Sequence, residues 1–290
     1  MNANTPKAPT PFSGDAFDLL RHGIYDDDAI GVFVNADRSF AVLDPSPTTD
    51  YTSYVPRNIK LGLSDSARRL AVIDDRLARI ADLIPSSGAL LEVGAGDGGF
   101  CRRIRESNAQ LRLVAVEPDR TTRPMRDKVP NLVQYDSLAD ARTAGERADT
   151  ICLFHVFEHV LEPRQFIADL FAVATPGARL IIEIPSLDDP LLSLYHCDAY
   201  EKFYFQRQHP YVYSARGLQR ALEDARCRIV RMIPYQRYGL ANHLTWLSRG
   251  KPGGDARLAA IFAESEANYR AALERAGTTD TVIAVVERAS

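Results

Sequence analysis

Short apolar runs alternate along this chain with segments of helical periodicity. The runs that suit strands lie at 89–93, 111–116, 132–135, 150–154, 180–184, 228–233 and 281–287. Between them, apolar residues recur at spacings of three and four, as in the segment that Ser64 or Asp65 can cap and Pro85 ends. This alternation predicts an α/β fold, a mostly parallel sheet with helices on both faces that binds ligands at the carboxyl ends of its strands.

The residues before this pattern have a different character. Residues 1–14 are polar and rich in proline, with little to bury, so we expect a disordered tail. The apolar runs 30–34 and 40–43 flank a polar tetrapeptide and predict a β-hairpin. An aromatic-rich linker follows, with Tyr51, Tyr54 and Pro56.

Composition and charge exclude several classes of protein. Of 290 residues, 46% are apolar and 25% are charged, as in ordinary globular chains, so wholesale disorder and fibrous folds are excluded. The formal net charge of −3 gives no general attraction to nucleic acid or to an anionic membrane. The cysteines form no C-x-x-C pair, so neither a zinc ribbon nor a disulfide framework is indicated. No apolar run suits a leader peptide or a membrane span. We therefore expect a cytoplasmic protein.

A glycine-rich turn at residues 91–100 is the most informative motif. The segment Leu-Glu-Val-Gly-Ala-Gly-Asp-Gly-Gly-Phe runs from a strand into a helix, and its glycines satisfy G-x-G-x-x-G, which a dinucleotide site would also use. Glu117, at the end of the next strand, can accept both hydroxyls of a ribose. Glu92 narrows the choice, because its carboxylate would repel a pyrophosphate but suits a ligand that carries an ammonium group.

The pattern E-x-G-x-G-x-G with an acidic strand end resembles the class I S-adenosylmethionine-dependent methyltransferases over about 64–235 and the last strand. The resemblance implies a Rossmann-like, doubly wound sheet of seven strands in the order 3-2-1-4-5-7-6, the seventh antiparallel, with an N-terminal extension and a helical cap inserted between strands 6 and 7. It implies S-adenosyl-L-methionine as cofactor and S-adenosyl-L-homocysteine as product. The cofactor-binding residues that it implies are Glu92, Gly94, Ala95, Gly96, Gly98, Glu117, Pro118, Asp136, Ser137, Phe154 and His155.

On this interpretation the chain divides at residue 60. Residues 1–60 are a disordered tail plus an N-terminal extension or lid, and residues 61–290 are a methyltransferase domain. Two stretches of that domain, 186–213 and 236–277, are substrate-side insertions.

Two further motifs suggest bases for the reaction. The segment 148–160 contains H-V-x-E-H, and residues 208–214 resemble the H-x-x-x-[YF]-[ST] segment of a large bacterial small-molecule branch. A hydroxyl acceptor must lose its proton, and histidine titrates nearest to neutral pH, so His155, His159 and His209 are the candidate catalytic residues. The alternatives are that His155 only flanks the cofactor, that His159 packs the turn with Glu158 bound to it, and that His209 binds backbone.

The segment 236–254 resembles methyltransferases among bacterial surface-polysaccharide and sugar-modifying enzymes. It implies a saccharide or other small-molecule acceptor, with a secondary metabolite as the alternative, and a monomer or homodimer that binds no nucleic acid. The residues expected to bind the acceptor are Tyr195, Tyr204, Tyr211, Tyr238, Asn242, His243 and Trp246. The alternative is a packed helical cap with Trp246 in its core. Asp188 and Asp189 are interpreted as turn residues, so no metal is expected.

Two other functions remain open at this point. An NAD-dependent oxidoreductase could use the same glycine turn, although Glu92 argues against it. A non-catalytic S-adenosylmethionine binder or a nucleic-acid methyltransferase is the other; the latter is disfavoured because the sequence has no basic stripe and no Asn-Pro-Pro-Tyr-like motif.

Overall fold

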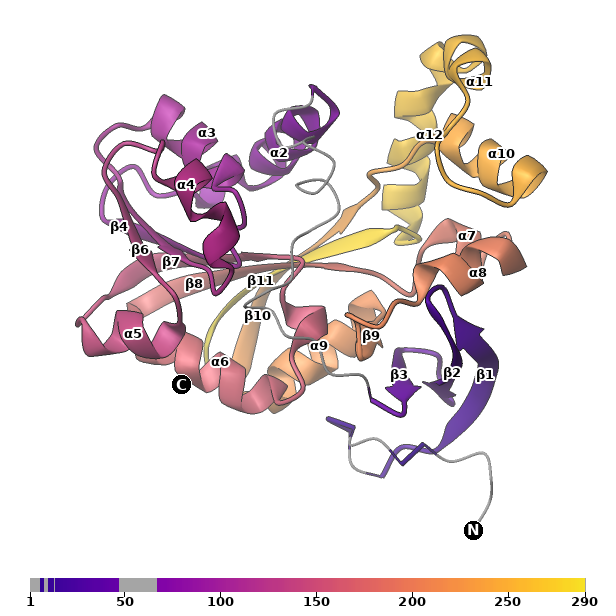
Figure 1. Cartoon of the computed structure of the whole chain (residues 1–290), viewed down its shortest axis with the longest axis horizontal. Helices are drawn as coiled ribbons and strands as arrows, with labels where there is room; N and C mark the ends of the chain where they lie inside the picture. Colours follow the sequence, from indigo (N-terminus) through magenta and orange to yellow (C-terminus); the bar gives the residue numbers. More distant parts are fainter. Residues whose placement is uncertain (1–5, 8–9, 13, 47–66, 290) are drawn as a thin grey trace.

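The computed structural model describes residues 6–7, 10–12, 14–46 and 67–289. It holds a seven-stranded sheet covered by helices and a smaller four-stranded sheet beside it (Figure 1). Several predicted features lie outside the described residues, namely Tyr51, Tyr54, Pro56, the capping candidates Ser64 and Asp65, and the division at residue 60.

The larger sheet has the strand order β10-β11-β8-β7-β4-β5-β6. Its strands are β4 (Ala89–Val93), β5 (Arg112–Val116), β6 (Leu132–Tyr135), β7 (Ala148–Phe154), β8 (Ala174–Pro185), β10 (Cys227–Tyr235) and β11 (Thr281–Arg288). β11 runs antiparallel to both of its neighbours, whereas the pairs from β8 across to β6 are parallel. In chain order this is 3-2-1-4-5-7-6 with the seventh strand reversed, which confirms the predicted Rossmann-like fold.

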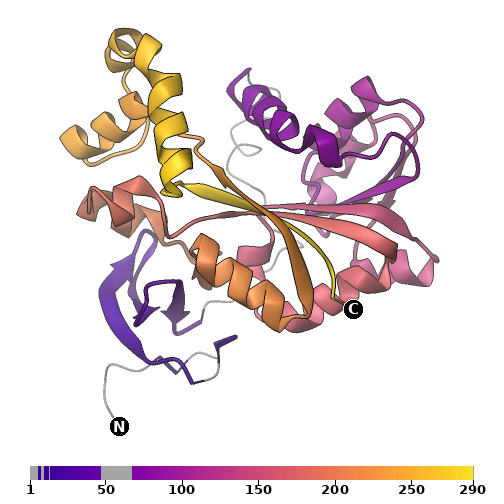
Figure 2. The ribbon, with the colours of Figure 1, turned by 180° about the vertical axis from the view of Figure 1, so that it is seen from behind.

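Helices cover both faces of this sheet (Figures 1 and 2). One face packs against α2 (Ala67–Ile80), η1 (Ala81–Leu83) and α3 (Gly99–Ser107), and the other against α5 (Leu138–Thr143), α6 (Pro163–Ala172) and α9 (Ala215–Asp224). Because successive side chains of a strand point to opposite faces, Leu90 joins the first core and Leu91 the second. Burial on both faces explains why these strands are continuous apolar runs.

The smaller sheet joins two distant parts of the chain. Its strands β1 (Phe17–Ile24), β2 (Asp27–Asn35), β3 (Phe40–Asp44) and β9 (Tyr211–Tyr213) are antiparallel in that order. The predicted hairpin is β2–β3 in a longer form, and β1 was not predicted. Since β9 follows the loop that carries His209, the pairing of β3 with β9 joins the N-terminal strands to one of the predicted site segments.

A helical cap lies between β10 and β11, as predicted, and projects beyond the sheet (Figure 2). Its helices are α10 (Leu240–Arg249), α11 (Ala256–Ile261) and α12 (Ala263–Ala276). Phe262 separates α11 from α12, and Ile261, at the end of α11, is 69% exposed. Among the residues described, no helix has the length and apolar character of a membrane span.

The connections near the site are short. Residues 120–126 form η2 (Arg120–Thr122) and α4 (Arg123–Arg126), η3 (Phe157–His159) follows β7, and α7 (Pro190–Ser193) and α8 (Asp198–Tyr204) precede β9. Helix α6 ends at Ala172, and β8 begins two residues later at Ala174.

Candidate functional site

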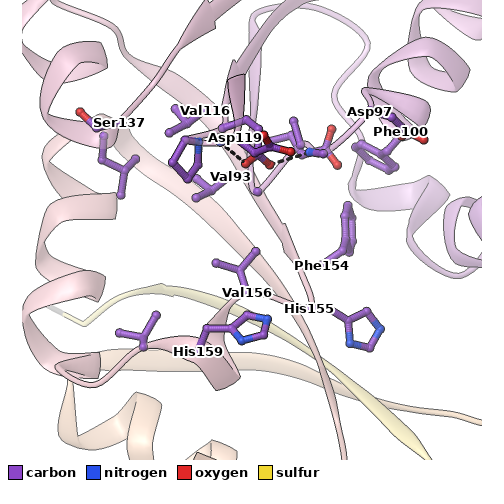
Figure 3. A pocket seen from close by; sticks show the side chains of 18 of the residues that line it. Val93, Asp97, Phe100, Val116, Asp119, Ser137, Phe154, His155, Val156 and His159 are labelled. Carbon is purple, nitrogen blue, oxygen red and sulfur yellow. Dashed lines mark hydrogen bonds between the residues drawn. The ribbon is translucent and has the colours of Figure 1, made fainter. Parts of the chain in front are cut away.

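A cavity of about 690 Å³ opens at the carboxyl ends of β4, β5 and β7 (Figure 3). This is the edge at which a sheet of this kind binds ligands. Its lining includes most of the predicted cofactor-binding residues, namely Glu92, Gly94, Ala95, Gly96, Glu117, Pro118, Asp136, Ser137, Phe154 and His155. Gly98 is the exception: it adopts φ 76° ahead of α3 and packs against Arg126.

The glycine-rich turn shapes one wall of the cavity. Gly94 adopts φ 73°, a conformation that disfavours other residues, and a Cβ atom there would overlap Val156. Its N–H donates to the Val116 carbonyl at 2.8 Å, which ties the turn to the end of β5. The bare backbone therefore lets a ligand approach closely at this wall.

Glu117 is fixed by the backbone around it. Its carboxylate accepts the N–H of Gly96 at 2.7 Å and the N–H of Asp119 at 2.9 Å, one on each oxygen. A carboxylate oxygen can accept two hydrogen bonds, so both oxygens can still accept ribose hydroxyls. Nearby, Asp136 binds Arg120 at 2.6 Å, and Ser137 caps α5.

Glu92 and Asp97 make one end of the cavity acidic. Glu92 is 4% exposed and accepts the Cys101 thiol proton at 3.1 Å; burial raises the pKa of its carboxyl to about 8. Asp97 is bound by Arg69 and by the N–H of Gly99, while its Oδ2 is buried with no hydrogen-bond partner among the described residues. A cationic ligand group would stabilise the ionised form of Glu92 and supply a partner for Asp97.

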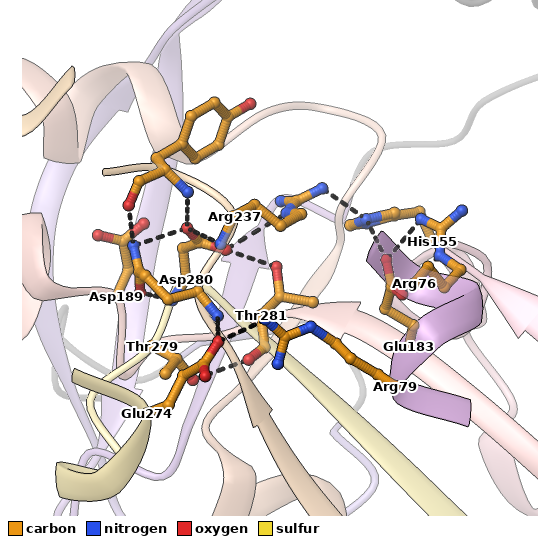
Figure 4. A network of polar contacts seen from close by, with 12 residues as sticks. Arg76, Arg79, His155, Glu183, Asp189, Arg237, Glu274, Thr279, Asp280 and Thr281 are labelled. Atoms are coloured by element: carbon orange, nitrogen blue, oxygen red, sulfur yellow. Dashed lines mark hydrogen bonds and ion pairs between the residues drawn. The ribbon is translucent and has the colours of Figure 1, made fainter. Parts of the chain in front are cut away.

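Arg76, His155 and Glu183 form a group of buried charged and polar side chains (Figure 4). Arg76 donates two hydrogen bonds of 2.6 Å to Glu183, and the His155 ring lies 3.1 Å from Glu183 and 3.2 Å from Glu158. Burial opposes charge on His155, but its hydrogen bonds to the two carboxylates outweigh burial and raise its pKa. Glu158 therefore binds His155, whereas one of the alternatives from the sequence paired Glu158 with His159.

His159 and His209 lie together at the far side of the cavity. Their ring centroids are 4.9 Å apart, and both rings line the cavity. The Nδ1 atom of His159 is hydrogen-bonded to the Gln208 carbonyl. Burial lowers the pKa of His209 to about 4, so its imidazole is neutral at physiological pH. The structure thus brings together the three candidate bases, which the sequence places in two segments.

The residues expected to bind the acceptor do not line this cavity. Trp246 is 3% exposed and packs edge-on against Tyr200 at 5.0 Å, in the core that α8 and α10 share with the smaller sheet. Tyr195 and His243 both bind the hydroxyl of Tyr269, at 2.8 and 2.7 Å. Tyr204 and Tyr211 are also buried, and Tyr238 and Asn242 are partly exposed elsewhere. The burial of Trp246 agrees with the alternative interpretation from the sequence, a packed helical cap with Trp246 in its core.

The interpretation of two other acidic residues agrees with the structure. Asp188 accepts the N–H of Ala215 at 2.8 Å, ahead of α9, and Asp189 accepts the N–H of Leu191 at 2.8 Å, as the cap of α7. Both carboxylates have structural partners in turns.

Arg69, Arg76 and Asp97 line the cavity but were not predicted. Asp97 lies inside the glycine-rich turn, so its position was a usable signal. Arg69 and Arg76 are seven residues apart on α2 and therefore share a face, which a search for polar residues at helical spacing could have found. Nothing local indicates that this face meets the cavity.

A sheet of this order, a glycine-rich turn behind a buried glutamate and an acidic end to the next strand define a class I S-adenosylmethionine-dependent methyltransferase. The family model described as a methyltransferase domain matches residues 65–231, and the chain belongs to that family. S-adenosyl-L-methionine is the cofactor of this class.

Relatives and solved structures agree with this family. A probable S-adenosylmethionine-dependent methyltransferase of Mycolicibacterium smegmatis is 26% identical over 121 residues, 41% of this chain and 45% of the relative, so the match spans less than half of that protein. A SAM-dependent methyltransferase from Archaeoglobus fulgidus gives a TM-score of 0.53 at 14% identity, over 79% of this chain and 99% of that one. The plantazolicin methyltransferase BpumL, solved with a substrate analogue and SAH, gives 0.51 at 12% identity, over 81% and 90%. At these identities the two structures show a shared fold.

Proposed function

We propose that this protein transfers the methyl group of S-adenosyl-L-methionine to a small-molecule acceptor, namely a hydroxyl or carbon of a sugar that is nucleotide-linked or part of a glycan. The observation that carries the proposal is the buried Glu92 carboxylate at the acidic end of the cavity. It suits the ammonium group of the cofactor, which would stabilise the ionised carboxylate, whereas a pyrophosphate would oppose that ionisation and gain no ion pair there. For this reason an oxidoreductase is not carried forward.

In this proposal, different residues of the cavity bind different parts of the cofactor. Glu92 and Asp97 face its aminoacyl end, Glu117 accepts the ribose hydroxyls, and Asp136 and Ser137 lie beside the adenine. The bare glycine turn leaves room for the nucleoside against the backbone. The histidine side of the cavity would then be left for the acceptor.

Methyl transfer is an in-line displacement. An acceptor oxygen forms a bond to the methyl carbon as the carbon–sulfur bond breaks, the sulfonium becomes a neutral thioether, and the hydroxyl proton passes to a base. Alignment of acceptor, methyl group and sulfur can lower the barrier by about 7–11 kcal/mol. The chain's main contribution is thus a cavity that holds both reactants in line and excludes water.

We assign the base to the pair His159 and His209. His209 is neutral at physiological pH and faces the cavity, so it has a lone pair that can accept the proton. His155 is held between the Glu158 carboxylate and the Arg237 guanidinium, which donates to its Nε2 at 2.8 Å, so it is better suited to positioning the cofactor wall. A base whose pKa lies near the working pH typically contributes about 10²–10⁴ in rate, and the lowered pKa of His209 places it toward the lower end of that range.

The support for a sugar acceptor is the sequence pattern at 236–254, and a secondary metabolite is the alternative. Both acceptors would enter beside His209, and aromatic walls pack on sugar C–H surfaces and planar rings alike.

The cofactor is tested by thermal unfolding with S-adenosyl-L-homocysteine and, separately, with NAD. We expect stabilisation by the former, because it binds the native state. Glu117→Ala should weaken that stabilisation, while Glu106→Ala, at an exposed position of α3, should leave it unchanged. Stabilisation by NAD alone would overturn the proposal.

The acceptor is tested by incubating the protein with labelled methyl donor and panels of nucleotide sugars, glycans and aromatic metabolites. We expect label in a saccharide. With the acceptor found, His209→Ala should lower kcat by about 10²–10⁴ and leave S-adenosyl-L-homocysteine binding intact. Unchanged turnover would remove His209 from the mechanism.

A further inference from the structure

Glu158, His159 and His209 converge where η3 meets the loop before β9. Each offers one ligand atom, and these atoms all lie within 4.8 Å of one another. Glu158 and His159 are neighbours in η3, whereas His209 comes from a loop that packs against η3 through the bond between Gln208 and His159. His159 lies at the edge of the cavity (Figure 3).

Glu158 has an unsatisfied oxygen. The side chain is fully buried, its Oε1 lies 3.2 Å from the Nδ1 of His155, and its Oε2 has no hydrogen-bond partner in the described part of the chain. A buried carboxylate oxygen without a partner is costly, and native structures rarely keep one. A cation beside Oε2 would remove that cost.

His159 is oriented as metal-binding histidines are. A backbone carbonyl can only accept a hydrogen bond, so the contact with Gln208 places the proton of His159 on Nδ1 and the lone pair on Nε2. Histidines that bind metals usually donate their other ring N–H to a carbonyl or carboxylate in this way. The same loop then supplies the next residue, His209, whose ring centroid is 4.9 Å from that of His159.

We propose that Glu158, His159 and His209 form a binding site for a divalent transition-metal ion of the Zn²⁺ type. Two imidazoles and one carboxylate are a donor set of sites that keep a coordination position open. Tetrahedral coordination needs donor atoms about 3.4 Å apart, so the side chains close in by small rotations when the ion binds. The sequence had suggested no metal, because the metal candidates weighed there were Asp188 and Asp189, which were interpreted as turn residues.

The open position faces the cavity, since His159 and His209 both line it. Resting on the proposed methyl transfer, we infer that this position takes an oxygen atom of the acceptor, whose proton then passes to solvent. With the ion bound, the two imidazoles hold metal, so this arrangement replaces the assignment of His159 and His209 as the base. The metal dependence of turnover therefore separates the two roles.

The test uses the full chain, freed of metal by a chelator and titrated with Co²⁺ as a spectroscopic probe. We expect one ion per chain, with a visible d–d band, and displacement by Zn²⁺. His209→Ala should weaken Co²⁺ binding at least tenfold. The control is the double variant His22→Ala/His196→Ala, which removes two exposed histidines and should bind as the unmodified chain does.

A second variant covers the case in which His209→Ala does not fold. His209→Cys keeps a metal ligand, so it should bind Co²⁺ and add a thiolate-to-cobalt charge-transfer band. A role in packing or in proton transfer would give no such band. The proposal is overturned if that band is missing, if the unmodified chain binds Co²⁺ no better than His209→Ala, or if the surface variant loses the ion.

These titrations contain neither cofactor nor acceptor, so they are independent of the methyl-transfer proposal. A chain that binds Co²⁺ but is not stabilised by S-adenosyl-L-homocysteine would refute the proposed function and keep the metal site. The reverse result would refute the metal site alone.

Discussion

At the scale of single residues, the cavity depends on carboxylates buried beside a backbone turn. Glu92 is ionised only at a cost, because water is excluded from it and no arginine of the described residues forms a hydrogen bond with it. A cationic ligand repays that cost by pairing with the carboxylate. Cofactor affinity and the stability of the ligand-free protein should therefore respond in opposite directions to a change at this position.

Glu92→Gln tests this opposition. The pKa of Glu92 is about 8 in the folded protein against 4.5 for an ordinary glutamate, so the folded state binds more protons between these values, and the free energy of unfolding falls as pH rises through them. At pH 8 the neutral variant should be more stable without ligand, by on the order of 1–3 kcal/mol. Its stabilisation by S-adenosyl-L-homocysteine should be smaller. Urea unfolding at pH 5 and pH 8 measures both.

Glu106→Gln is the matched control, because that side chain is exposed on α3. It should change neither quantity. A Glu92→Gln protein that is less stable at pH 8 and binds the ligand normally would show that Glu92 has a packing role instead.

At the scale of elements, α2 is attached to the sheet by a buried ion pair. Arg76 of α2 makes two 2.6 Å hydrogen bonds to Glu183 of β8, which is fully buried. Arg76→Met should lower the free energy of unfolding by about 3–5 kcal/mol, because the Glu183 charge stays buried with His155 as its remaining partner.

The double variant Arg76→Met/Glu183→Met separates the pair from its parts. With no unpaired carboxylate left, much of the stability should return, since apolar replacements of buried pairs are often tolerated. Urea unfolding of the four proteins in the cycle gives the coupling. Additive losses would mean that the two side chains act independently.

Within the cap, a side chain of α12 caps the N-terminus of α10. Glu266 of α12 accepts the N–H groups of Leu240 and Ala241 at 2.9 and 2.8 Å, so one helix caps the start of another, α10. Gly239 leaves room for this carboxylate. Glu266→Ala should cost about 0.5–2 kcal/mol and speed hydrogen exchange in the first turn of α10. Glu264→Ala, exposed on the same helix, is the control, and equal exchange in both variants would exclude the cap.

At the scale of the whole molecule, the smaller sheet supports the acceptor side of the cavity. Phe40 of β3 is fully buried against Tyr211 and Tyr213 of β9, at 5.4 and 5.0 Å between ring centroids, and the N–H of Leu43 donates to the Pro210 carbonyl next to His209. The sheet that begins near the N-terminus therefore positions a loop of the main domain.

Phe40→Ala should cost about 3–5 kcal/mol and loosen that loop. We expect KM for the acceptor to rise while the affinity for S-adenosyl-L-homocysteine changes little, because the glycine-rich turn belongs to the other sheet. Tyr25→Ala, at an exposed ring of the same sheet, is the control for stability and kinetics. Parallel losses of both affinities would place the loop's effect on the entire cavity.

The sequence predicted those contacts best whose residues lie close together along the chain or at the ends of adjacent strands. Glu92, the glycines and Glu117 lie in adjacent strand ends, so a local pattern was enough to place them on one cavity wall. His155, His159 and His209 were identified by residue type, but their roles depend on partners such as Glu183 and Arg237, which no local pattern connects to them. Trp246 shows the limit, since an aromatic residue suits an acceptor wall and a core equally, and its neighbours place it in the core.

The sequence by itself determined the strands of the larger sheet, their alternation with helices, the glycine-rich turn and the acidic residues beside it. These follow from periodicity and backbone conformation, which are properties of consecutive residues. Only the tertiary structure decided that Glu158 binds His155, that His159 and His209 are neighbours, and that Trp246 of the cap is buried in a core. Those outcomes depend on how surfaces far apart in the chain pack together, since packing sets the burial and partners on which the charge of each group depends.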